Sequence, residues 1–182
     1  MRGIIAFLFI TAIASGTEAQ TSVVRGAVAA VAGGGRTWDD EGSIGNGAIA
    51  GGRVEWRLFG NTSIEGAIET LAHDRRGGFF QSEGRSNLFS VSLLHRFGSP
   101  GVQPYVLEGV GLVRHSGTTR VDDLATQRTS TDTAFHFGAG LAVSIGERIE
   151  IGPEARFYVI TASNGSDPAW ANWIGARLGV RF

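Results

Sequence analysis

The sequence predicts an all-β protein: an eight-stranded antiparallel up-and-down transmembrane β-barrel with short periplasmic turns and longer outer loops. Three observations lead to this prediction. The last thirteen residues alternate between apolar and polar side chains, seven earlier segments of similar length show related patterns, and the connections between segments alternate between short and long. A period of two indicates strands whose two faces meet different surroundings.

The terminal segment Trp170–Phe182 shows the alternation most clearly. Its apolar face carries Ile174, Ala176, Leu178, Val180 and Phe182, and its other face carries Gly175, Arg177, Gly179 and Arg181. Charge on one face and unbroken apolar surface on the other are typical of a barrel strand with lipid outside and a polar interior.

Eight segments of about 11–13 residues each are long enough to cross a bilayer as tilted strands, which takes roughly 9–11 residues. The expected strands are Ser22–Gly33, Gly47–Leu58, Thr62–His73, Arg85–Phe97, Gln103–His115, Thr133–Ile145, Ile149–Thr161 and Trp170–Phe182. The expected short connections are Phe59–Asn61, Gly98–Val102 and Gly146–Arg148, and the expected long loops are Gly34–Asn46, Asp74–Gly84, Ser116–Asp132 and Ala162–Ala169. Short turns on one side and long loops on the other indicate an outer-membrane barrel.

The polarity of the strands separates this prediction from a soluble ligand-binding barrel. Such a barrel also closes at about eight strands, but its interior is apolar and its outside is wet. Here that arrangement would expose wide bands of Phe, Leu, Ile and Val to water, which soluble monomers rarely do. The apolar faces are therefore expected to meet lipid.

Residues 1–19 have the pattern of a cleaved signal peptide. Arg2 precedes the uncharged apolar run Ile4–Ala14, and Thr17-Glu18-Ala19 offers a small-x-small cleavage site. The apolar run is too short to span a bilayer as a helix. We expect an exported chain whose barrel domain comprises residues 20–182. The chain has no cysteine, and a net charge of −1 without a basic stripe gives no indication of nucleic-acid binding.

Three stretches carry a resemblance to a known family. They are Pro104-Tyr105-Val106 with Gly109-Val110-Gly111, then Gly138-Ala139-Gly140, and the terminal Gly179-Val180-Arg181-Phe182. Over residues 20–182 the chain resembles the small outer-membrane β-barrel family of OmpA/OmpX type. The resemblance implies that Phe182 is the signal read by the barrel-assembly machinery, and that outer-membrane lipid and lipopolysaccharide surround a monomer.

The inward positions collect nearly balanced charges. They are Arg25, Arg53, Arg57, Arg96, Arg156, Arg177 and Arg181, with Glu55, Glu65, Glu69, Glu108, Glu150 and Glu154. Glu108 is on the inner face only if Tyr105 and Leu107 point outward. Because side chains fill an eight-stranded barrel and an unpaired buried charge costs several kcal/mol, we expect a network of Arg–Glu pairs. Two roles remain open for it: a structural plug, or a gate that passes small ions.

An enzyme is the less favoured alternative. Ser163 and Asn164 resemble the His-x-Ser-Asn stretch of the lipid A 3-O-deacylase family, but Thr161 occupies the histidine position. A serine needs a nearby base to act as a nucleophile. His115, near a long loop, is expected at the surface. We therefore expect no catalytic residues, metal or cofactor, and a role in envelope integrity or in surface contact through the outer loops.

Overall fold

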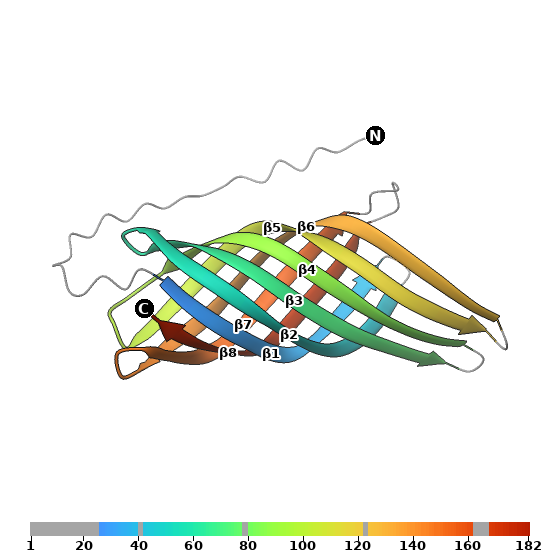
Figure 1. Ribbon diagram of the computed structural model, residues 1–182, viewed down its shortest axis with the longest axis horizontal. Helices are drawn as coiled ribbons and strands as arrows, with labels where there is room; N and C mark the ends of the chain where they lie inside the picture. Colours follow the sequence, from blue (N-terminus) through green and yellow to red (C-terminus); the bar gives the residue numbers. More distant parts are fainter. Residues whose placement is uncertain (1–25, 40–41, 78–79, 122–123, 162–167) are drawn as a thin grey trace.

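The computed structural model describes residues 26–39, 42–77, 80–121, 124–161 and 168–182. These residues form eight strands: β1 (Gly26–Asp39), β2 (Gly42–Phe59), β3 (Thr62–Gly77), β4 (Phe80–Arg96), β5 (Val102–Val121), β6 (Leu124–Ile145), β7 (Ile149–Thr161) and β8 (Ala169–Arg181). Each strand pairs with its sequence neighbour, and β8 returns to pair with β1 (Figure 1). The predicted eight-stranded antiparallel barrel is confirmed. No helix within the described residues is long and apolar enough to cross a membrane.

The seam between the first and last strands closes the barrel. Twelve residue pairs join β1 to β8, from Ala27 opposite Arg181 to Trp38 opposite Trp170. At the periplasmic end of the seam, Gly26 N–H donates to Phe182 O at 3.1 Å, and Phe182 N–H donates to Gly26 O at 2.9 Å. A closed ladder leaves no strand edge exposed within the hydrocarbon layer, where an unpaired backbone group costs several kcal/mol.

Short connections follow β2, β4 and β6, as predicted, and they lie at the same end of the barrel as the C-terminus (Figure 1). Gly60, after β2, has a φ of 49°, and Gly146, after β6, has a φ of 65°. These left-handed values are readily adopted only by residues without a Cβ atom, which accounts for glycine in these tight turns.

The predicted bounds of the long loops at the opposite end are wrong for three of the four connections, because the strands extend into them. The strand ladders continue outward to Asp39 opposite Gly42, Gly77 opposite Phe80, and Val121 opposite Leu124. Polar residues continue as strands here because the backbone ladder is independent of side-chain polarity outside the lipid. The fourth connection falls largely on residues 162–167, which lie outside the described residues.

The outward face of the barrel is apolar around its circumference. Exposed outward side chains include Val54, Ile68, Phe89, Val110, Phe137, Ile151, Ile174 and Leu178. Pro153 also points outward on β7, and the pairing between β6 and β7 skips its position and that of Gly152 without a change of register. The missing N–H of proline thus interrupts the ladder locally and causes no bulge.

The inward and outward faces of β5 are the reverse of those that would place Glu108 inside the barrel. Tyr105 and Leu107 are buried in the interior, so Val106, Glu108 and Val110 face outward. Glu108 is exposed between Leu93 of β4 and Phe137 of β6. Six residues of tilted strand separate it from the start of β5, about 15 Å along the barrel axis, which places its carboxyl group near the middle of the apolar band.

Replacing Glu108 by valine should therefore stabilise the barrel. A charged group that faces lipid near the midplane destabilises the barrel. For a carboxylate, we expect its removal to raise the free energy of unfolding by about 1–2 kcal/mol. The free energy of unfolding in phospholipid vesicles, from urea titration, measures it. Glu147→Val, in an exposed turn, is the control and should change stability little. A loss of stability in Glu108→Val would contradict the assigned orientation of β5.

Candidate functional site: the filled barrel interior

Charged side chains fill the interior on the side of the short turns. Ten of the predicted residues form one connected network of five arginines and five glutamates: Arg53, Arg96, Arg156, Arg177, Arg181, Glu55, Glu65, Glu69, Glu150 and Glu154. Their formal charges cancel, so the interior holds many ions without a net charge.

Arg53 connects opposite walls of the barrel. From β2 it reaches Glu69 on β3, where its Nε donates to Oε1 at 3.0 Å, and Glu154 on β7, where its Nη1 donates at 2.6 Å. All three side chains are buried. A guanidinium group can satisfy two carboxylates at once because it presents several donors in one plane.

Glu65 is a second junction, with no solvent-exposed surface. Its Oε1 accepts from Arg156 Nη2 at 2.5 Å and its Oε2 accepts from Arg177 Nη1 at 2.8 Å. Arg156 also donates from Nε to Glu154 at 2.5 Å, which joins this junction to Arg53. Each carboxylate oxygen thus receives a charge-assisted hydrogen bond, which offsets the cost of removing it from water.

The end of the network nearest the short turns is organised around Arg96. It donates to both oxygens of Glu55, at 3.2 and 2.7 Å, and to both oxygens of Glu150, at 3.1 and 3.0 Å. Arg177 donates to Glu55 at 2.7 Å, and Arg181 donates to Ser144 Oγ at 2.8 Å. The β-barrel is therefore closed to the periplasmic side by paired charges.

Three aromatic side chains inside the barrel complete the network. Tyr105 O–H donates to Glu154 at 2.5 Å, Tyr158 O–H donates to Glu69 at 2.9 Å, and Trp173 Nε1–H donates to Tyr158 at 3.2 Å. Tyr158 is buried inside the barrel. Trp173 also faces inward, as its alternation predicts.

Glycines on the inward face of β6 provide the space these large side chains need. A Cβ atom at Gly140 would overlap the Tyr105 phenol oxygen, and one at Gly138 would lie 2.9 Å from Arg156 Cγ. Because glycine has no side chain, a long side chain from the neighbouring strand can lie over the inner face of β6 at these positions.

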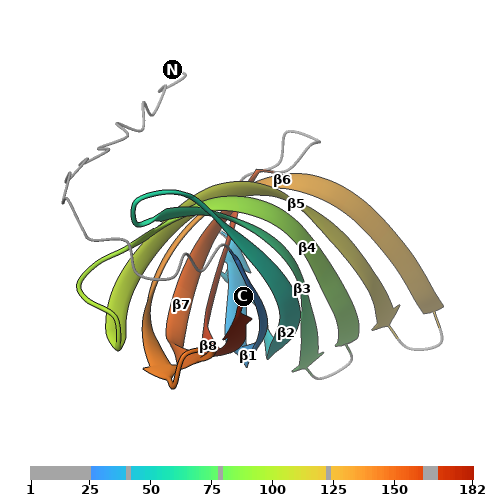
Figure 2. The ribbon, with the colours of Figure 1, turned by 60° about the vertical axis from the view of Figure 1, so that its left-hand side comes forward.

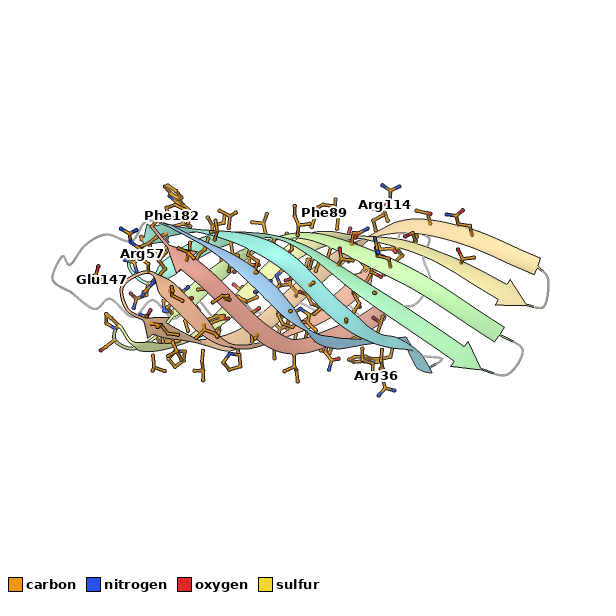
Figure 3. The ribbon with its side chains drawn as sticks, turned by 60° about the horizontal axis from the view of Figure 1, so that its bottom comes forward. Arg36, Arg57, Phe89, Arg114, Glu147 and Phe182 are labelled. Atoms are coloured by element: carbon orange, nitrogen blue, oxygen red, sulfur yellow. The ribbon has the colours of Figure 1, made fainter. Side chains whose placement is uncertain are left out.

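Three predicted members are not in the network. Glu108 faces outward, and Arg25 lies outside the described residues. Arg57 lies on the interior side of β2, but at the end beside the short turn, where its side chain is exposed (Figure 3). Its distance from the buried glutamates follows from its place at the barrel rim, which the alternation alone does not reveal.

An apolar layer lies beyond the charges, towards the long hairpins. It comprises Val31, Ile49, Leu88, Val113, Ala134, Tyr158, Ile160, Ala171 and Trp173. A cavity of about 40 Å³ lies against this layer. Within the described residues, no group of His, Asp or Glu side chains has the arrangement of a metal site. The barrel interior is therefore closed at two levels: by ion pairs on the side of the short turns, and by packed apolar side chains on the side of the long hairpins.

Removing Arg53 should destabilise the barrel strongly. Arg53→Ala leaves Glu69 and Glu154 without a shared cation, and breaking a buried pair from one side typically costs about 3–5 kcal/mol. The midpoint of urea unfolding, followed by the different gel migration of folded and unfolded barrel, measures the effect. Arg57→Ala is a matched control on the same strand and should change stability by less than about 0.5 kcal/mol. Equal effects of the two substitutions would contradict the network.

The filled interior should not conduct ions. In planar bilayers at neutral pH the folded protein should produce no steady unitary conductance, because the paired side chains occupy the lumen of an eight-stranded barrel. A stable conductance step that disappears when the protein is unfolded would contradict the closed interior and favour the gate.

The barrel is similar to solved outer-membrane barrels. The structure of Neisserial surface protein A matches with a TM-score of 0.68 and 14% identity, over 86% of this chain and 97% of that one. Ail, the attachment invasion locus protein of Yersinia pestis, matches with a TM-score of 0.61 and 15% identity, over 87% and 98%. The outer membrane enzyme PagL matches with a TM-score of 0.50 and 20% identity, over 84% and 97%. At these identities the similarity shows the fold alone.

No curated protein sequence matches the chain. Residues 5–182 match the family described as "Outer membrane protein beta-barrel domain". This match spans nearly the whole chain and agrees with the closed eight-stranded barrel, its apolar outer face and its solved structural neighbours. The chain therefore belongs to the outer membrane protein beta-barrel domain family, a family of the bacterial outer membrane.

Proposed function

We propose that this protein is a surface-contact protein, which presents an open-edged β-sheet to extended polypeptides outside the cell. The observation that supports the proposal is the extension of β3, β4, β5 and β6 well beyond the other strands, on the side away from the C-terminus (Figures 1 and 2). The closed barrel below it serves as the anchor.

The edge of this extension is formed by β6. Its outermost pair with β7 is Thr133 opposite Thr161, whereas its pairing with β5 continues to Leu124. Among the described residues, the stretch 124–132 of β6 therefore has a strand partner on one side only. Nine residues correspond to about 30 Å of strand. Unpaired N–H and C=O groups on such an edge can add a further strand from another chain, with backbone hydrogen bonds supplying affinity.

The surrounding lipid is a second expected partner. Arg36, Arg85 and Arg114 are exposed at the outer end of the apolar band, and Figure 3 shows Arg36 and Arg114 directed away from the barrel. Guanidinium groups bind phosphate oxygens in a bidentate manner. We propose that these residues contact lipopolysaccharide phosphates, and that lipid covers the apolar band of a monomer.

The exposed Phe182 ring lies at the periplasmic end of the β1–β8 seam (Figure 3). This position supports the proposal that the barrel-assembly machinery reads Phe182 before the seam closes. The signal peptide proposed for residues 1–19 lies outside the described residues.

The solved neighbours include proteins of different roles. Ail is an attachment invasion locus protein, whereas PagL is an outer membrane enzyme. Because the identities are low, the proposal rests on the outward extension of the sheet, in which the described residues pair 124–132 of β6 on one side only. The alternative lipid A hydrolase would use Ser163, which lies outside the described residues, and Thr161 in place of histidine supplies no base.

Shortening the β5–β6 hairpin tests surface contact. Deleting residues 117–128 and joining Ser116 to Thr129 through Asn-Gly removes most of the open edge but keeps a two-residue hairpin turn. Cells displaying wild-type protein should adhere to surfaces coated with serum and extracellular-matrix proteins, and cells displaying the shortened protein should adhere at the level of cells without it. Arg57→Ala, at the opposite end, is the control. Undiminished adherence of the shortened but folded protein contradicts the proposal.

A further inference from the structure

A serine, a histidine and an aspartate lie in contact at the outer end of the interior, apart from the Arg–Glu network. Ser86 Oγ is 2.7 Å from His115 Nδ1, and His115 Nε2 is 3.8 Å from Asp132 Oδ2. Ser130 O–H donates to the same aspartate oxygen at 3.1 Å. His115, expected at the surface, is half-buried, with its side chain 29% exposed.

The register of three adjacent strands brings these residues together. Ser86 of β4 is directly opposite His115 of β5, which is in turn opposite Ser130 of β6. Asp132 follows Ser130 by two residues and so lies on the same face. Side chains directly opposite in an antiparallel pair have Cβ atoms about 5 Å apart, close enough for a hydrogen bond. Because the three residues are far apart in the sequence, no local sequence motif indicates that they form a cluster.

The contact between Ser86 and His115 is that of a nucleophile with its base, with a carboxylate at ion-pair distance on the other side of the ring. With the proton of the neutral imidazole on Nε2, directed towards Asp132, Nδ1 accepts the hydrogen bond from the Ser86 hydroxyl. A serine becomes nucleophilic when a base within hydrogen-bond reach takes its proton and a third group orients that base. Ser86 and His115 lie at hydrogen-bond distance, and the Asp132 carboxylate lies 3.8 Å from His115 Nε2, where it favours the protonated imidazole that forms during the reaction.

A cavity lies beside the pair. Ser86 and His115 both line the space of about 40 Å³, and its wall is otherwise formed largely by apolar side chains that include Leu71, Val113 and Ile160. At about 10–15 Å³ for each water-sized group, the space accepts about three such groups. An acetyl or propionyl group is of this size, whereas a long acyl chain is not. The partial exposure of His115 allows solvent to reach the site.

We propose that Ser86, His115 and Asp132 form a hydrolytic site for esters of short-chain carboxylic acids at the outer mouth of the barrel. Ser86 Oγ attacks the ester carbonyl carbon while its proton passes to His115 Nδ1. The carbon–oxygen bond to the alcohol then breaks, and His115 returns the proton to the departing alkoxide. Water, deprotonated by His115 Nδ1, then attacks the acyl carbon; the bond to Ser86 Oγ breaks, His115 returns the proton to Ser86 Oγ, and the acid leaves. Asp132 is a positioning residue that holds the imidazole and stabilises its protonated form.

A second serine–histidine pair provides an internal comparison. Ser92 Oγ is 2.9 Å from His136 Nε2, deeper in the barrel. His136 Nδ1 has no hydrogen-bond partner among the described residues, and neither Ser92 nor His136 lines the cavity. This pair lacks both the orienting carboxylate and the space for an acyl group, so Ser92→Ala is a matched control for Ser86→Ala.

The test uses the folded full-length protein in detergent micelles, with folding verified by gel migration before and after boiling. A fluorophosphonate probe should label wild-type protein at Ser86, located by mass spectrometry. p-Nitrophenyl acetate should be hydrolysed faster than p-nitrophenyl decanoate. Ser86→Ala and His115→Gln should each lower the rate at least about 100-fold, in the range expected for loss of the nucleophile or its base. Ser92→Ala should keep labelling and turnover.

Asp132→Asn separates positioning from a merely structural role. It should lower kcat at least about tenfold with little change in KM, because the cavity is unchanged while the imidazole loses its orienting carboxylate. Three results would overturn the proposal: folded wild-type protein that neither labels at Ser86 nor hydrolyses the acetate ester, Ser86→Ala protein with undiminished turnover, or equal losses in Ser86→Ala and Ser92→Ala.

Discussion

The burial of paired charges inside a narrow barrel is the constraint on which the rest of this structure depends. Ten formally charged side chains lie in an interior that lipid surrounds. Each would be very costly alone, because desolvation of an ion costs several kcal/mol even after relaxation. The strands must therefore hold their register closely enough for carboxylates and guanidinium groups from opposite walls to meet.

Arginine suits this interior because one side chain can bridge several carboxylates. Arg53 bonds to Glu69 and Glu154, and Arg96 bonds to both oxygens of Glu55 and Glu150. A lysine ammonium lacks the planar fork that these geometries use. All sixteen basic residues of the chain are arginine. Glycines of β6 complete the arrangement, since Gly138 and Gly140 leave space that Arg156 of β7 and Tyr105 of β5 occupy.

Much of the fold could be predicted from alternation, because lipid on one side and ions on the other give each strand two unlike faces. The prediction fails at β5, where Tyr105 and Leu107 are buried inside while Val106 and Val110 face lipid. Both faces of this strand contain apolar residues, so periodicity could not orient Glu108. Strand ends were also missed, since polar residues continue the ladder beyond the membrane as far as Val121 and Leu124.

The contacts within the interior could not be predicted, because they depend on how strands far apart in the sequence face one another across the barrel. Alternation places Arg53 and Glu154 on inner faces, but only the closed barrel brings them to 2.6 Å. The same holds for Ser86, His115 and Asp132, whose proximity comes from strand register. The filled interior closes the barrel, and the outward extension of β3 to β6 supplies the surface on which the proposed contact function rests.

A double-mutant cycle between Arg53 and Glu154 tests the central claim most directly. The free energies of unfolding of Arg53→Met, Glu154→Gln and the double variant, measured in the same vesicles as wild type, give the coupling between the two side chains. A direct buried ion pair predicts a coupling of about 2 kcal/mol or more, with the double variant less destabilised than the sum of the single variants. Additive effects within about 0.5 kcal/mol would contradict the paired interior.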